Sequence, residues 1–119
     1  MKKKHAKRIL GRKIGPRQAL LRGLTSALLL HGSIVTTEAK AKELRLFCEP
    51  LITKAKAGDS LHIRRQLLSA LGHKADVERI LEVGKANAKR PGGYLRLTHL
   101  QPRYQDNAAQ MRVDFVDAA

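Results

Sequence analysis

The sequence is poor in the residues that build most chemical sites. Its single cysteine, Cys48, permits no internal disulfide and no cysteine-based zinc site, and it suits a reducing compartment such as the cytosol. Tryptophan is absent and only two tyrosines and two phenylalanines occur, which leaves few rings on which nucleic-acid bases could stack. No run of about eighteen apolar residues is present, so no membrane-spanning helix is expected.

Acidic residues are absent from the first 37 positions, and Glu38 is the first. Repulsion among many like charges disfavours a compact free chain unless a polyanion supplies the opposite charge. Nucleic acid is the natural candidate, because each neutralised phosphate releases condensed counterions. A membrane surface is less suitable, since this segment has no Trp or Phe to insert. Nine of the net fourteen positive charges precede Glu38: Lys2, Lys3, Lys4, Lys7, Arg8, Arg12, Lys13, Arg17 and Arg22.

The titratable residues form no pattern typical of catalysis or metal binding. Glu78 and Glu82 are spaced i,i+4, but Arg79 and Lys85 beside them indicate a solvated helix face. No histidines are paired at helical spacing, so no metal site is expected: His5, His31, His62, His73 and His99. We therefore expect no enzyme activity, no cofactor and no small-molecule substrate.

Hydrophobic periodicity predicts an arm followed by four helices. Residues 1–15 are interrupted by glycines and are expected to be an extended basic arm, and Pro16 suits the first position of a helix. The apolar spacing of 3.6 residues then predicts helices over 16–32, 38–58, 61–72 and 77–89. Pro50 falls inside the second of these and is expected to kink or break it near Glu49. On that helix, the residues expected to face the core are Leu44, Phe47, Cys48, Leu51 and Ile52.

Strand signals occur in two places. The β-branched stretch 33–37 predicts a short strand, and Thr36 or Thr37 is placed to cap the helix that follows it. After Gly93 the apolar period changes to two, which predicts strands over 94–101 and 109–117 joined as a hairpin by the loop 102–108. The expected fold is α+β, with a basic arm (1–15) and one globular domain (16–119). In it, about four helices pack on a small mixed sheet, formed by the short strand and the C-terminal hairpin.

The segment that begins at Lys89 contains two adjacent glycines followed by Tyr94. Pro91 disfavours helix at the preceding Arg90, and a glycine can adopt the positive φ that a sharp entry into a strand requires. A simple turn is one interpretation. The other is an RNA-binding segment in which the glycines allow close approach, Tyr94 offers a flat face, and four residues supply charge: Lys89, Arg90, Arg96 and Arg103.

The scarcity of aromatic residues favours recognition of nucleic acid through backbone charge and shape. A helix-turn-helix is poorly matched, because the link between the first two helices is β-branched and too long. An RNA-binding protein is the preferred interpretation, and a small nucleoid or DNA-binding protein is the alternative.

A block in residues 16–56 has a recognisable pattern, carried by Arg17, Ala19, Arg22, Leu24, His31, Ile34, Thr36, Thr37, Lys40, Ala41, Lys42, Glu43, Glu49, Leu51, Ile52 and Thr53. With this pattern, the block resembles the bacterial large-subunit ribosomal protein seventeen (L-seventeen) family. The resemblance extends to the arm at His5, Arg8, Leu10 and Arg12, to the Gly-Gly-Tyr segment and to the last strand. Pro16 and Gly11 depart from the family's histidine and asparagine.

The resemblance implies a structural and assembly role in the cytoplasmic large ribosomal subunit, with no catalysis. It implies contact with 23S-type ribosomal RNA and with neighbouring large-subunit proteins. Together with the charge pattern, it predicts the following RNA-binding residues: Lys2, Lys3, Lys4, His5, Lys7, Arg8, Arg12, Lys13, Arg17, Arg22, Lys89, Arg90, Tyr94, Arg96 and Arg103.

Overall fold

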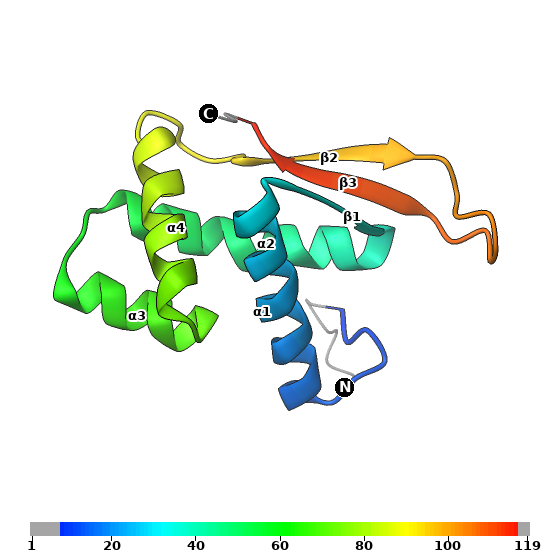
Figure 1. Ribbon diagram of the computed structural model, residues 1–119, viewed down its shortest axis with the longest axis horizontal. Coiled ribbons are helices and arrows are strands. Elements are labelled where there is room, and N and C mark those ends of the chain that lie inside the picture. The colour runs from blue at the N-terminus through cyan, green and yellow to red at the C-terminus, as the bar shows by residue number, and fades with distance from the viewer. Residues whose placement is uncertain (1–7, 117–119) are drawn as a thin grey trace, which may run out of the picture.

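The computed structural model describes residues 8–116, in which four helices lie on one side of a three-stranded sheet (Figure 1). The expected α+β fold and the order of its elements are confirmed. None of the helices in this range has the length and apolar character needed to cross a membrane. The elements are α1 (Ile14–His31), β1 (Ser33–Thr37), α2 (Glu38–Lys56), α3 (Leu61–Leu71), α4 (Lys74–Ala86), β2 (Leu95–Leu100) and β3 (Gln110–Phe115).

The sheet is entirely antiparallel, so the expected mixed sheet is wrong. The strand order is β1-β3-β2, and both outer strands pair antiparallel with β3. The reason is that the returning strand of the hairpin lies in the middle and separates β1 from β2. At the centre of the register, Val113 faces Ile34 on one side and Leu97 on the other. β1 occupies the predicted residues 33–37.

Helix α2 lies at the centre of the structure and contacts the other three helices and all three strands. Its buried face includes Leu44, Cys48, Leu51 and Ile52, as predicted, whereas Phe47 is only half-buried and packs against the edge of the core. Burial raises the pKa of the Cys48 thiol to about 12, so the thiol stays protonated at neutral pH and is a core side chain.

The two helical prolines are accommodated without a break. α1 begins at Ile14, two residues before Pro16, which lies in the first turn, where backbone N–H groups have no helical partner. α2 continues through Pro50, against the expected kink or break. A proline at this position leaves the carbonyl of Leu46 without its helical donor. Leu46 and Pro50 are both exposed, so water can hydrogen-bond that carbonyl.

The N-terminal ends of the helices differ in the hydrogen bonds that their first residues make. Thr37 takes the N-cap position of α2, but its side chain makes no capping hydrogen bond. Ser60 caps α3, and its hydroxyl accepts the N–H of Ile63 at 3.3 Å. α4 begins at Lys74, three residues earlier than expected. Its first turn contains the buried Asp76, whose carboxylate accepts the hydroxyl of Ser26 on α1 at 3.2 Å.

The α4–β2 link is held by the carboxylate of Glu49 on α2. Glu49 Oε2 accepts the N–H groups of Gly93 at 3.1 Å and Tyr94 at 3.3 Å. The Tyr94 side chain is buried, and its hydroxyl lies 3.1 Å from both Thr53 Oγ1 and Lys56 Nζ. Lys56 Nζ also lies 5.1 Å from the centroid of the Tyr94 ring. The segment is therefore a turn fixed to the core by α2.

A first prediction concerns the contact between α4 and α2. A Cβ added at Gly84 would lie 2.9 Å from both the backbone carbonyl carbon and the Cβ of Ala55. We expect Gly84→Ala to lower the free energy of unfolding by about 1–3 kcal/mol, because the two helices must move apart. Gly23→Ala in α1 is the matched control, since no atom lies within 4 Å of its added Cβ. It should raise stability by up to about 1 kcal/mol through helix propensity. Urea denaturation measures both, and an equal effect of the two variants would contradict the packing argument.

A second prediction concerns the turn before β2. Gly93 has φ 64°, whereas Gly92 has no positive φ, and neither would meet an atom within 4 Å of an added Cβ. We expect Gly93→Val to cost about 1–2 kcal/mol through backbone strain alone. Gly92→Val should change the free energy of unfolding by less than about 0.5 kcal/mol. Thermal and urea unfolding of the two variants distinguish a conformational requirement at position 93 from a general sensitivity of the loop.

Candidate nucleic-acid interface

The first described residue, Arg8, is fixed to the body of the protein. Its backbone N–H donates to Glu43 Oε2 at 3.3 Å, and its guanidinium lies 3.7 Å from the same oxygen. Glu43 is only 2% exposed, so this contact also supplies the counter-charge of a buried carboxylate. The arm was predicted to be extended, and this is wrong for the segment from Arg8 to Lys13. The segment turns at Leu10 and Gly11, whose φ angles are positive. Five predicted RNA-binding residues lie outside the described range: Lys2, Lys3, Lys4, His5 and Lys7.

Three predicted cations gather where α1 begins. Arg12 and Lys13 are exposed and Arg17 is half-buried, and none of them forms an ion pair within residues 8–116. The first turn of α1 contains no acidic residue, and the N-cap residue Lys13 makes no side-chain cap. A helix N-terminus carries a partial positive charge, so these cations raise the local positive potential further. This end of the molecule is therefore well suited to a bound anion.

Arg22, also predicted to bind RNA, has a structural role. Its Nε donates to the carbonyl of Ala70 at 2.9 Å and its Nη2 to the carbonyl of Ser69 at 3.1 Å. These carbonyls belong to the last turn of α3, which has no basic residue of its own. A cation there satisfies exposed carbonyls and complements the negative end of the helix. Arg22 thus joins α1 to α3.

The predicted residues of the C-terminal half differ in their surroundings. Lys89 is exposed in the α4–β2 link, whereas Arg90 is half-buried there and its carbonyl accepts a hydrogen bond from Lys56. Arg96 on β2 is exposed, 3.9 Å from Asp114. Arg103 in the hairpin loop is paired with Asp106, and this hydrogen bond lowers the pKa of the Asp106 carboxyl to about 2.

The prediction for Tyr94 is corrected by its burial. Its ring is 1% exposed, so it offers no flat face on which a base could stack. The apolar ring is packed in the core and its hydroxyl is satisfied by side chains of α2. Sequence reasoning missed these partners, together with the two carboxylates of α2, Glu43 and Glu49. An early signal was available: glutamates are rare in this basic chain, and these two flank the apolar face of one helix.

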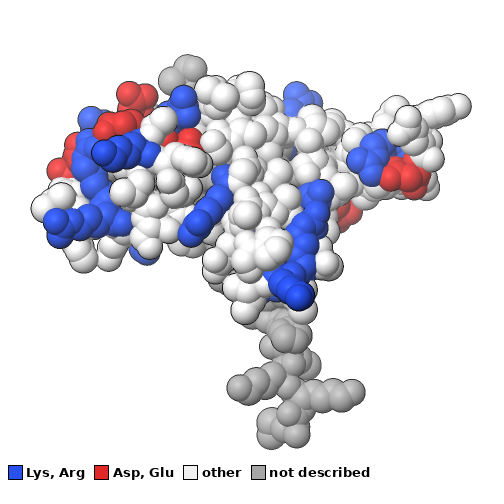
Figure 2. Space-filling model, turned by 60° about the horizontal axis from the view of Figure 1, so that its bottom comes forward, with Lys and Arg blue, Asp and Glu red and all other residues white. Residues whose placement is uncertain are grey.

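The predicted cations do not form a single patch. The start of α1, the α4–β2 link and the hairpin loop lie at three separate corners of the molecule (Figure 1). Figure 2 shows separate basic side chains on one face, with acidic side chains mainly toward its two ends. In the part of the chain that the structure describes, no group of three or more His, Cys, Asp or Glu side chains is placed to hold a metal ion.

Comparison with known proteins gives a consistent result. A family model described as ribosomal protein L17 matches residues 20–116. The relative named large ribosomal subunit protein bL17 from Nitratidesulfovibrio vulgaris is 51% identical over 108 residues, which cover 89% of this chain and 80% of the relative. The protein of the same name from Clostridium botulinum is 44% identical over 110 residues, which cover 92% and 96%. That from Chlorobium phaeobacteroides is 44% identical over 119 residues, which cover 98% and 70%. The chain belongs to the ribosomal protein L17 family.

Proposed function

We propose that this chain is a structural constituent of the large ribosomal subunit in the cytoplasm and that it has no catalytic activity. In this proposal it binds large-subunit ribosomal RNA through its N-terminal arm (residues 1–15) and the start of α1. The rest of the chain (16–119) forms one domain that holds this basic end in place and contacts neighbouring large-subunit proteins. Family membership supports the ribosomal role.

The observation that carries the RNA-binding proposal is the unmatched positive charge at the start of α1. Arg12, Lys13 and Arg17 surround a helix N-terminus with no acid in its first turn. Such an arrangement is unfavourable in the free protein and becomes favourable when phosphate groups lie against it. The lysines at positions 2, 3, 4 and 7 extend the same charge along the chain. Because phosphate contacts release counterions, binding of this kind should depend strongly on salt.

A nucleoid or DNA-binding protein was the alternative. Sedimentation distinguishes the two, because a constituent of the large subunit migrates with that particle in a density gradient. A chain that migrates with the nucleoid would contradict the proposal.

A third prediction tests the arm. Replacing Lys2, Lys3, Lys4 and Lys7 with Gln should weaken binding to large-subunit ribosomal RNA without changing the circular dichroism spectrum. The slope of log K against log salt should become shallower by up to about 3 units, if each lysine contacts one phosphate. A control replaces four exposed cations of the body that form no ion pair within residues 8–116: Arg45, Lys54, Lys85 and Arg112. Equal losses from both sets would show that only net charge matters and would contradict a specific role of the arm.

A fourth prediction concerns RNA binding by the α4–β2 link and the start of β2. Lys89 and Arg96 are exposed on either side of the Gly-Gly turn. Neither takes part in the hydrogen bonds by which Glu49 accepts the N–H groups of Gly93 and Tyr94. Lys89→Gln together with Arg96→Gln should leave the melting temperature nearly unchanged and weaken RNA binding less than the arm variant does. Unchanged affinity would show that this segment is only a turn and a strand, and that the arm and α1 carry the binding.

A further inference from the structure

Helix α3 has two faces with different surroundings. One face packs against the core and contains Ile63, Leu67, Ala70 and Leu71. A second face contains Leu61, Arg64, Arg65 and Leu68, which follow the i, i+3, i+4, i+7 spacing of a helix stripe. Leu61 is 64% exposed and Leu68 is 37% exposed, so residues 8–116 cover the apolar part of this second stripe only in part.

The second face of α3 and the first turns of α4 line a surface groove of about 310 Å³. α4 contributes Lys74, Val77 and Glu78. Val77 is 4% exposed and belongs to the core cluster, so the groove is continuous with the hydrophobic interior. We call this feature the α3–α4 groove.

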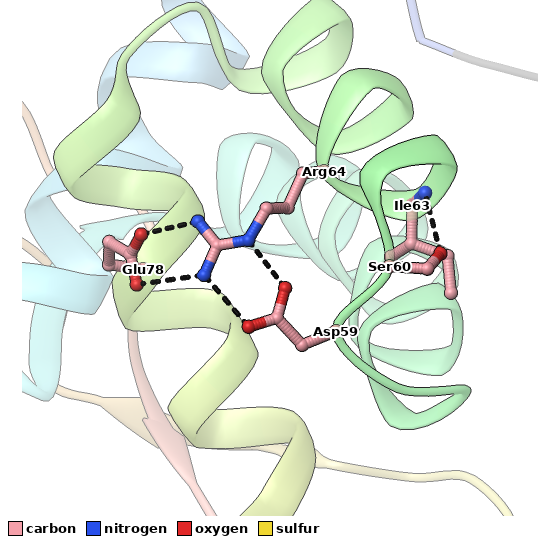
Figure 3. Close-up of polar contacts among 5 residues, drawn as sticks. All are labelled: Asp59, Ser60, Ile63, Arg64 and Glu78. Carbon is pink, nitrogen blue, oxygen red and sulfur yellow. Dashed lines mark hydrogen bonds and ion pairs between the residues drawn. The ribbon is translucent and has the colours of Figure 1, made fainter.

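An ion-pair network at the rim holds the groove in shape. Arg64 on α3 donates to Asp59, which precedes the helix, and its Nη1 lies 2.5 Å from Glu78 Oε1 on α4 (Figure 3). The hydrogen bonds from Arg64 lower the pKa of both carboxyls, so the network stays ionised at neutral pH. The charge of Arg64 is thereby matched, whereas Arg65 and Lys74 at the rim form no ion pair within the described residues.

The chemistry of the groove selects between possible occupants. Phosphate groups gain nothing from a floor of leucine and valine, and the groove has no aromatic ring on which a base could stack. A polypeptide with large apolar side chains would bury Leu61 and Leu68, and its carboxylates would match Arg65 and Lys74. The seven-residue step from Leu61 to Leu68 spans about 10 Å, the length of two helical turns.

We propose that the α3–α4 groove is a docking site for an amphipathic helix of another protein. That helix places apolar residues at i, i+3 or i+4, and i+7 against Leu61, Leu68 and Val77, and it presents Asp or Glu to Arg65 and Lys74. The inference does not rest on RNA binding, because it concerns a different surface and a different class of partner.

Synthetic peptides of about 14 residues test the proposal on the purified full-length chain. The first is an acidic amphipathic helix with leucines at the stated spacing. The second has the same composition with its leucines dispersed around the helix, and the third replaces its acids with lysine. Fluorescence anisotropy should give a Kd for the first peptide that is at least about tenfold lower than for either of the others. Equal affinity for the first two peptides, or no binding, would overturn the proposal.

Variants of the groove locate the binding. Leu61→Ser with Leu68→Ser should weaken binding of the first peptide about tenfold or more. Leu30→Ser should have no effect on that binding, because Leu30 lies on α1, although it is 58% exposed. Arg65→Glu with Lys74→Glu should reverse the preference toward the lysine peptide. These side chains are at the surface, and circular dichroism confirms that the variants remain folded.

Two other occupants would overturn the proposal with distinct results. RNA would be identified as the occupant if an RNA oligonucleotide displaced the first peptide. In that case the oligonucleotide should no longer bind the Arg65→Glu, Lys74→Glu variant but should still bind the Leu61→Ser, Leu68→Ser variant. Self-association of the chain in analytical ultracentrifugation, abolished by the leucine variant, would identify a second copy.

Discussion

Helix α2 is the element on which the rest of the structure depends. It contributes an apolar face to the core, and two of its glutamates bind distant segments of the chain. Among the elements of residues 8–116, α2 is the one that contacts all the other helices and strands. The two glutamates outside its apolar face bind distant segments of the chain: Glu43 binds Arg8, and Glu49 binds the backbone before β2. The core packing, the Glu43 contact and the Glu49 contact are all made by α2. The position of this helix therefore determines where Arg8 and the start of β2 lie.

The few acids of this chain act mainly within the protein. Asp59 and Glu78 bind Arg64, Asp76 binds Ser26 and Arg79, and Asp106 binds Arg103. Each such contact neutralises a cation of the body or satisfies a group at a helix end. The consequence is a division of the positive charge. Cations of the helical body and the hairpin tip are partly matched, whereas Arg12, Lys13 and Arg17 at the start of α1 form no ion pair within residues 8–116.

The local pattern predicted the elements well and their long-range partners poorly. The predicted bounds of β1 are correct because its β-branched residues lie between a helix-ending glycine and the N-cap of the next helix. The buried face of α2 follows from its 3.6-residue period. Tyr94 was misread because a tyrosine beside two glycines has the same local pattern in a turn and in a binding loop. Its burial depends on Thr53, 41 positions earlier, a relation that spacing alone does not contain. The prediction of a mixed sheet was wrong for the same reason, since the pairing of β1 with β3 is a property of the assembled core.

The contact between Arg8 and Glu43 limits how far the arm can search. If the chain were tethered only at the start of α1, thirteen preceding residues could extend about 45 Å. Fixed at Arg8, the seven residues before it can extend no more than about 25 Å from that point. In the proposed complex, a shorter tether would confine the four lysines to a smaller volume and raise their effective concentration near the positive end of α1. Without touching RNA, the buried glutamate would then limit which phosphates those lysines can reach.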